Sequence, residues 1–225
     1  NVRLSPQGLA RACGEARRLF EWLRLTQPKR YKSITPGWIA TIRPVKIPTE
    51  SRKEHQAVTL QMVRELVEVP GDSLALKRDK AAAAFLFLSG ARATAFCTLS
   101  LDCVDIASRT VKQLPSLGVK TKNSKAAVTS LLEIPDLLAV AAEWDSYARA
   151  HLPGSAPWYT VIKVVNGEPQ LDDSPPGNYR ARMLRKNLRK LFDATTVSYM
   201  SPHKFRHGHA VYALKLAEDV GDLKA

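Results

Sequence analysis

The stretch AAAAFLFLSGAR at residues 81–92 decides how the rest of the chain is arranged. We predict a helix over residues 76–89 that is apolar on nearly every side from Ala81 onward, and such a helix belongs at the centre of a domain. Gly90 ends this helix, because glycine readily adopts the conformation that follows a last helical turn. A further helix is predicted over roughly 92–100, with Arg92 in its first turn. The sequence therefore predicts an arginine at the edge of a buried core.

A second basic motif, HKFRH at residues 203–207, lies in the last predicted helix, which Ser201 caps. About one helical turn separates residues 203, 206 and 207, so their side chains are expected to project to the same side. Arginine matches two phosphate oxygens at once, and histidine donates a hydrogen bond or moves a proton near neutral pH. Together with Arg92, the motif indicates a site that binds a phosphodiester and stabilises the extra charge of its transition state.

The charge of the chain indicates the same kind of partner. Its 225 residues include 34 Lys and Arg against 21 Asp and Glu, which gives a formal net charge of +13. A basic excess of this size usually means a polyanion such as nucleic acid, although scattered surface lysines would give the same total. The hydrophobic fraction of 45% is typical of a globular chain with a sizeable core.

We expect neither a membrane protein nor a metalloprotein. No stretch approaches 18 apolar residues without a charge, and we find no secretory signal, so a cytoplasmic, nucleoid-associated protein is predicted. Cys13, Cys97 and Cys103 form no CxxC pair, which argues against a zinc site or a disulfide framework. No metal and no other cofactor is expected.

The residues before position 58 differ in character from the rest. Residues 8–25 are predicted to form an amphipathic helix whose polar face carries arginines, and prolines then interrupt a strongly basic stretch up to residue 57. The basic face of the helix could lie on phosphates or could simply be solvated. We place a domain boundary near residues 46–57.

The residues after position 58 combine helices with a few short strands. Thr59 resembles the N-cap of a helix that Pro70 and Gly71 stop. Strands are predicted at residues 103–106, 109–113 and 128–134, with a turn at 120–125, and a helix from Pro135 to about His151. Residues 153–178 are predicted as a loop with one short strand at most, and 179–194 as a basic helix. The predicted fold class is mainly α with a small antiparallel β-sheet (α+β).

The order of these motifs resembles the catalytic domain of tyrosine recombinases, the phage-integrase-type site-specific recombinases. That order is an arginine after a glycine at the end of a buried helix, a lysine in a β-hairpin, and H-x-x-R-H at the start of a later helix. The resemblance covers roughly residues 58–220. It implies that residues 1–45 are part of a helical core-binding domain, 46–57 a basic linker, and 58–225 a catalytic domain truncated before its nucleophile segment.

The resemblance also implies a role for each residue of the site. Arg92 and Arg206 would hold the non-bridging oxygens of the scissile phosphate, and His203 would assist proton transfer there. His207 would support the fold and the site from behind, and Lys122 of the hairpin would protonate the leaving 5′ oxygen. The lysines of this turn, any of which could be solvated or could replace the preferred one, are Lys120, Lys122 and Lys125.

Other features leave alternatives open. Arg92 could be a helix-start arginine paired with Asp102 or Asp105. Members of the family usually have an acidic residue three positions after the first arginine, where this chain has Ala95. Their nucleophilic tyrosine lies well beyond the second arginine, so Tyr212 is too near and is expected to pack. We therefore expect the nucleophile beyond residue 225 and this fragment to be inactive alone.

The function implied by the resemblance is that of a site-specific DNA recombinase or integrase from a phage or mobile element. It would cleave and rejoin strands through a 3′-phosphotyrosyl link, without ATP or metal, as four protomers on paired sites of double-stranded DNA. The alternatives are a DNA-binding protein that has lost cleavage and an unrelated basic protein that binds RNA or a protein. The residues expected on the DNA backbone are Arg17, Arg18, Lys29, Arg30, Lys32, Arg182, Arg185, Lys186 and Arg189.

Overall fold

The computed structural model describes residues 6–43, 56–177 and 179–217. The chain divides into two compact units, Asn1–His55 and Gln56–Ala225. The predicted linker at 46–57 lies outside the described residues except for its last two positions. Within the described ranges, no helix is long and apolar enough to cross a membrane.

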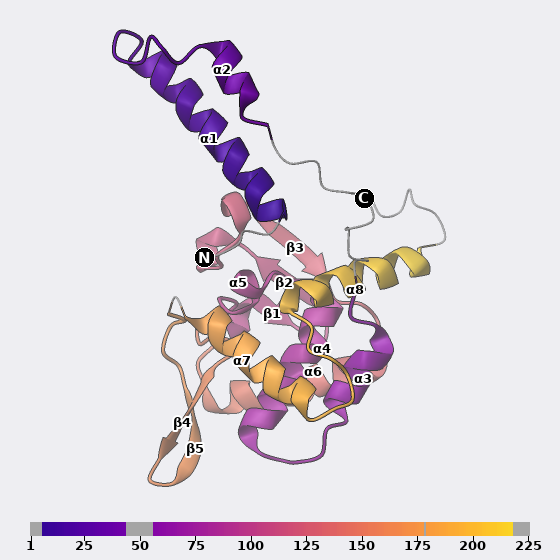
Figure 1. Ribbon diagram of the computed structural model, residues 1–225. Helices are drawn as coiled ribbons and strands as arrows, with labels where there is room; N and C mark the ends of the chain where they lie inside the picture. The colour runs from indigo at the N-terminus through magenta and orange to yellow at the C-terminus, as the bar shows by residue number, and fades with distance from the viewer. Residues whose placement is uncertain (1–5, 44–55, 178, 218–225) are drawn as a thin grey trace. The chain divides into compact units, whose positions relative to one another are not determined.

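The first unit contains two helices, α1 (Pro6–Thr26) and α2 (Pro36–Thr41), which pack side by side (Figure 1). α1 is the helix predicted over 8–25. α2 begins after Thr35, whose hydroxyl accepts a hydrogen bond from the Trp38 amide at 3.1 Å. The edge-to-face contact of Phe20 and Trp38, with ring centroids 4.9 Å apart, joins the two helices, and Ile39 is buried there.

The second unit is built around α4 (Leu74–Ser89). Every residue from Ala81 to Leu88 is fully buried, so the prediction of a central apolar helix is confirmed. The surrounding helices, drawn in Figure 1, are α3 (Leu60–Val67), α6 (Pro135–His151), α7 (Arg180–Asp193) and α8 (Pro202–Leu216). Thr59 caps α3, and Pro135 begins α6, as predicted.

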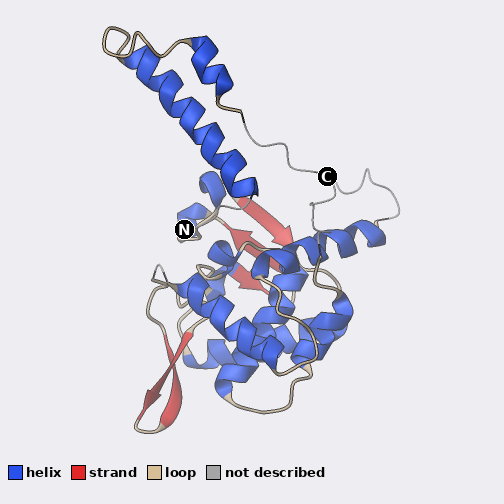
Figure 2. Ribbon diagram, in the orientation of Figure 1, coloured by secondary structure: helices blue, strands red, loops and turns tan. Residues whose placement is uncertain are grey.

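A three-stranded antiparallel sheet lies beside these helices, in the order β1 (Val104–Asp105), β2 (Thr110–Gln113), β3 (Ala127–Ser130) (Figure 2). The 3₁₀ turns at Leu101–Cys103, Pro115–Leu117 and Lys122–Ser124 flank its strands. The mainly α fold with a small antiparallel sheet is confirmed. The strand predicted over 128–134 is too long, because the amide of Leu132 donates to the carbonyl of Leu88 instead of to a strand.

Two other predicted segments are wrong. The helix predicted over 92–100 is a single turn, α5 (Ala93–Phe96), because the chain then leaves it and the carbonyl of Leu99 accepts from the amide of Trp158. The segment 153–178 contains a β-hairpin, β4 (Val161–Val165) and β5 (Glu168–Asp172). Asn166 and Gly167 form its turn, both with positive φ. Asn-Gly is the strongest short-range hairpin signal, so this hairpin could have been predicted from the sequence.

Candidate functional site

The carboxyl end of α4 is the foundation of the site. The last carbonyls of a helix have no partner within the helix, so they must be satisfied from elsewhere. Ser89 Oγ donates to the carbonyl of Phe85 at 2.7 Å, and the amide of Gly90 donates to that of Leu86 at 3.1 Å. The amide of Leu132 donates to the Leu88 carbonyl at 2.9 Å. The chain therefore leaves α4 at a fixed place and direction.

Two side chains of α8 complete this set of hydrogen bonds. Arg206 Nη1 donates to the carbonyl of Gly90 at 2.7 Å, and His209 Nδ1 lies 2.8 Å from the carbonyl of Phe87. Because a carbonyl only accepts, the Nδ1 atom of His209 carries the proton. His209 is not among the predicted site residues, because a single histidine inside a helix gives no sequence signal of such a role.

Arg92 and Arg206 come from distant parts of the chain, and the hydrogen bond from Arg206 to the carbonyl of Gly90 brings Arg206 to the segment that carries Arg92. Arg92 is the exposed residue that precedes α5, and Arg206 lies one turn into α8. Burial lowers the pKa of Arg206, and the positive charge of Arg92 lowers it further. Within the described ranges, no ion pair joins Arg92 to Asp102 or Asp105, the alternative partners considered above.

The two histidines of the HKFRH motif contact each other. Their Nε2 atoms are 3.0 Å apart and their ring centroids 4.4 Å apart, at an interplanar angle of 80°. The Nε2–H of one ring therefore donates a hydrogen bond to the Nε2 of the other. His203 is exposed, whereas Phe205, on the opposite side of α8, is fully buried. The amphipathic start of α8 thus presents His203 to solvent, whereas His207 is half-buried.

Gly208 allows the start of the second unit to cross α8 closely. A Cβ atom at this position would overlap the carbonyl oxygen of Val58. The amide of Val58 donates to the carbonyl of Lys204 at 3.1 Å. α8 is therefore held on one side by α4 and on another by the segment that leads into α3.

The candidate lysines lie on the connection between β2 and β3. Lys122 begins the 3₁₀ turn Lys122–Ser124, in which Asn123 has a φ of 58°. The amide of Lys120 donates to Thr98 Oγ1 at 2.9 Å, which ties this connection to the residues after α5. The side chains of Lys120, Lys122 and Lys125 are all exposed. Among the described contacts, none brings any of the three against the arginines.

The outer face of α7 is strongly basic. A surface hollow of about 690 Å³ runs along it. Its lining consists of Tyr179, Arg182, Met183, Arg185, Lys186, Arg189 and Tyr199. The guanidinium of Arg189 lies over the ring of Tyr199, 4.2 Å from its centroid. Arg180, in contrast, is buried, and its pKa is lowered by that burial. Cations and aromatic rings on one surface suit contacts with a nucleic-acid backbone.

The basic residues predicted in the first unit are placed differently. Lys29, Arg30 and Lys32 are exposed after α1, and Arg30 lies over the ring of Tyr31, 5.6 Å from its centroid. Arg17 is half-buried. Arg18 is paired with Glu15 at 2.9 Å, an exposed contact that contributes little to stability.

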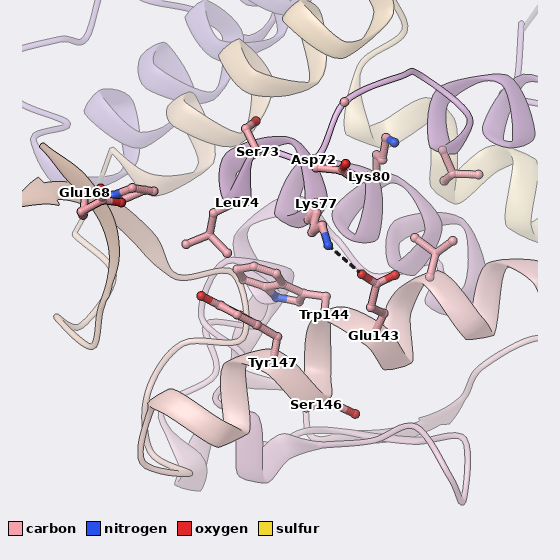
Figure 3. Close-up of a pocket in the computed structure, with 14 residues that line it drawn as sticks. Asp72, Ser73, Leu74, Lys77, Lys80, Glu143, Trp144, Ser146, Tyr147 and Glu168 are labelled. Atoms are coloured by element: carbon pink, nitrogen blue, oxygen red, sulfur yellow. Dashed lines mark hydrogen bonds and ion pairs between the residues drawn. The ribbon is translucent and has the colours of Figure 1, made fainter.

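A cavity of about 880 Å³ lies at the other end of α4 (Figure 3). Lys77 of α4 and Glu143 of α6 form an ion pair of 3.1 Å across it, and Trp144 and Tyr147 line its wall. α4 has 16 residues and is therefore about 24 Å long, so this cavity is remote from Arg92. It contains none of the candidate catalytic or DNA-binding residues predicted from the sequence.

The comparisons with known proteins establish the fold. No protein-family model matches the sequence, and no curated protein matches it. Among solved structures, XerA recombinase aligns with a TM-score of 0.51 and 16% identity, over 97% of this chain and 72% of its own. The chain has a recombinase fold. The Tn1549 transposon integrase in complex with transposon right-end DNA gives a TM-score of 0.52 at 13% identity, over 94% and 75% of the two chains. The expected likeness in fold to tyrosine recombinases is confirmed.

Proposed function

We propose that this chain carries the strand-cleaving centre of a site-specific DNA recombinase or integrase. The observation that supports this most strongly is the hydrogen bond from Arg206 of α8 to the carbonyl of Gly90, two residues before Arg92, which brings like charges from distant segments together. Like charges repel, so an anion between them is stabilised by both. A phosphodiester in the transition state of cleavage is such an anion, and fixed donors around it lower the barrier.

Each residue then has a chemical task. Arg92 and Arg206 hold the non-bridging oxygens while a tyrosine oxygen attacks the phosphorus. A 3′-phosphotyrosyl link forms and the bond to the 5′ oxygen breaks. Lys122 gives that oxygen a proton, and His203 assists proton transfer at the phosphate, with His207 supporting it. Religation reverses these steps on a second strand, so neither ATP nor a metal is required.

Double-stranded DNA would lie along the basic surfaces. Arg182, Arg185, Lys186 and Arg189 of α7 and the basic residues of the first unit contact phosphates, whose recognition does not depend on sequence. Four protomers would act on two paired sites, in the cytoplasm and in association with the nucleoid. The proteins of similar fold include a transposon integrase in complex with DNA, which favours an origin in a phage or mobile element.

A second candidate is a DNA-binding protein that has lost cleavage. Ala95 supports it, because this position usually carries an acidic residue in tyrosine recombinases, and here the alanine is 2% exposed on α5. No carboxylate can then brace the arginines from that position. A complete polypeptide that binds duplex DNA but forms no covalent complex would favour this candidate.

The test is the variant Arg206→Ala in the full-length protein, with a nicked suicide substrate that traps the covalent complex. We expect covalent complex to be abolished while duplex affinity stays within about threefold, because many other cations contact the backbone. Arg109→Ala, which removes an exposed cation paired with Glu133, is the matched control and should retain cleavage. Equal loss of binding and cleavage in Arg206→Ala would contradict a catalytic role.

A further inference from the structure

We infer that His209 is a positioning residue that fixes Arg206 beside Arg92. This inference rests on the proposed function, because it explains how the two arginines come to act on one phosphate. His209 lies one turn after Arg206 on α8, so the two side chains are neighbours on one face of the helix. Both reach the carboxyl end of α4.

The first support is the hydrogen bond to Phe87. The carbonyl of Phe87 is among the last of α4, where no helical amide is available, and Phe87 is fully buried. A buried carbonyl without a partner destabilises the fold by about 1–3 kcal/mol. His209 is the described side chain that satisfies it.

The second support is the contact between His209 and Gly90. A Cβ atom at Gly90 would lie only 2.6 Å from Cδ2 of the imidazole, so the ring packs directly on this glycine. Gly90 also has a φ of 57°, which disfavours other residues. The carbonyl of the same glycine accepts the hydrogen bond of Arg206 at 2.7 Å. The imidazole therefore sets how closely α8 approaches the loop that leads to Arg92.

The charges around His209 fit this role. Burial lowers the pKa of His209, and the neighbouring Arg206 lowers it further, while the hydrogen bond to Phe87 opposes them. The neutral ring still donates through Nδ1. It can thus hold the helices together without adding a third positive charge beside the two arginines.

Loss of this contact should affect placement more than folding. Other contacts hold α8, including the buried Phe205 and the hydrogen bond between Val58 and Lys204. Without the imidazole, Arg206 and its acceptor carbonyl can shift relative to Arg92. A displacement of about 1 Å at a reacting centre can reduce the rate about 100-fold.

Three variants separate placement from packing. His209→Asn keeps an N–H donor close to the position of Nδ1, whereas His209→Gln moves the donor outward and His209→Leu removes it. The matched control is Tyr212→Leu, which removes a ring contact with Phe87 (5.9 Å between centroids) between the same two helices. Urea unfolding of each variant shows whether it is folded. If His209→Leu does not fold, the comparison of His209→Asn with His209→Gln decides whether His209 positions Arg206.

The first measurement does not require activity. The Nε–Hε NMR signal of Arg206, identified by its loss in Arg206→Lys, is compared between variants with and without inorganic phosphate. In the wild type, His209→Asn and Tyr212→Leu, we expect a resolved signal that shifts with phosphate. In His209→Gln and His209→Leu, the signal should move to the position of a free arginine. The inference would be overturned if the signal were unchanged in His209→Gln and His209→Leu. It would also be overturned if the signal of Tyr212→Leu moved to the position of a free arginine as well.

The second measurement is covalent-complex formation by the full-length protein on a nicked suicide substrate. We expect a fall of at least about tenfold for His209→Gln and His209→Leu, rescue to within about threefold by His209→Asn, and unchanged duplex affinity in all. Equal rates for Asn and Leu would again contradict positioning. If the wild type itself forms no covalent complex, the proposed cleavage fails, and the NMR comparison still decides whether His209 places Arg206.

Discussion

Near the start of α4, Arg78 is surrounded by partners, whereas beyond the last turn of the same helix Arg92 and Arg206 lie near each other without a described carboxylate. Arg78 is paired with Asp79 at 2.8 Å, donates to the carbonyl of Thr160 at 3.1 Å, and lies over the ring of Tyr159. The hydroxyl of Tyr159 donates to Asp79 at 2.9 Å. The first arrangement neutralises a charge that the core buries, and the second leaves positive charge available to an anion from outside.

The largest effect on stability should follow from removal of the ion pair between Arg78 and Asp79. Asp79→Ala leaves the guanidinium of Arg78 buried and unpaired, so the free energy of unfolding should fall by about 3–5 kcal/mol. Urea unfolding measures this. Glu143→Ala is the control, since it breaks the exposed pair with Lys77 and should cost less than about 1 kcal/mol. Similar losses in both variants would mean that the two pairs do not differ as described.

The opposite end should respond in activity rather than in stability. Arg92→Ala removes an exposed side chain and relieves repulsion with Arg206. The free energy of unfolding should therefore change by no more than about 0.5 kcal/mol. Covalent-complex formation by the full-length protein should fall by about 10²–10³-fold, the usual cost of losing one transition-state donor. A large loss of stability in Arg92→Ala would instead place this arginine with Arg78 as a structural residue.

Removal of one cation from the basic face of α7 should have an intermediate effect, on duplex affinity and its salt dependence. Arg185→Ala should weaken duplex binding about equally for all sequences and reduce the slope of log affinity against log salt by about 1. Affinity measured at several salt concentrations gives the slope. Lys77→Ala removes a cation at the other end of α4 and should leave the slope unchanged. An unchanged slope in Arg185→Ala would remove α7 from the DNA surface.

The smallest effect concerns pH. Because the pKa of His209 is lower in the folded state than its ordinary value of 6.5, the unfolded chain takes up the proton first as the pH falls. The free energy of unfolding should therefore decrease as pH falls below about 6.5 and level off below the folded pKa. His209→Asn should lack this decrease. Urea unfolding of both proteins at several pH values measures the difference, and parallel curves would contradict it.

The two ends of α4 also differ in how far the sequence reveals them. The run of apolar residues from Ala81 predicts a central helix, and Gly90 predicts its end, because both depend on local composition. The order of Arg92 and HKFRH predicts the fold by resemblance. The start of α6 follows from Pro135, which fits the first turn of a helix.

Other features depend on contacts that sequence patterns do not carry. The single turn of α5 ends because Leu99 pairs with Trp158, far along the chain. His209 donates a hydrogen bond to the backbone carbonyl of Phe87. A backbone carbonyl is present at every position, so the residue type at position 87 does not indicate this contact. The roles of Arg92, Lys122, His203, Arg206 and His207 stay predictions. The β4–β5 hairpin is different, since Asn166-Gly167 was a local signal.

The hydrogen bond from Arg206 to the Gly90 carbonyl has one more consequence. An arginine side chain loses about 2 kcal/mol of rotamer entropy when it is fixed. Here the hydrogen bond to Gly90 restricts the Arg206 side chain when the protein folds, so this entropy is lost before DNA binds. A guanidinium has five N–H groups, so several remain for a ligand after one is given to the carbonyl. The DNA strand therefore binds to a donor that is already ordered, and the free energy of binding is not reduced by the entropy of ordering Arg206.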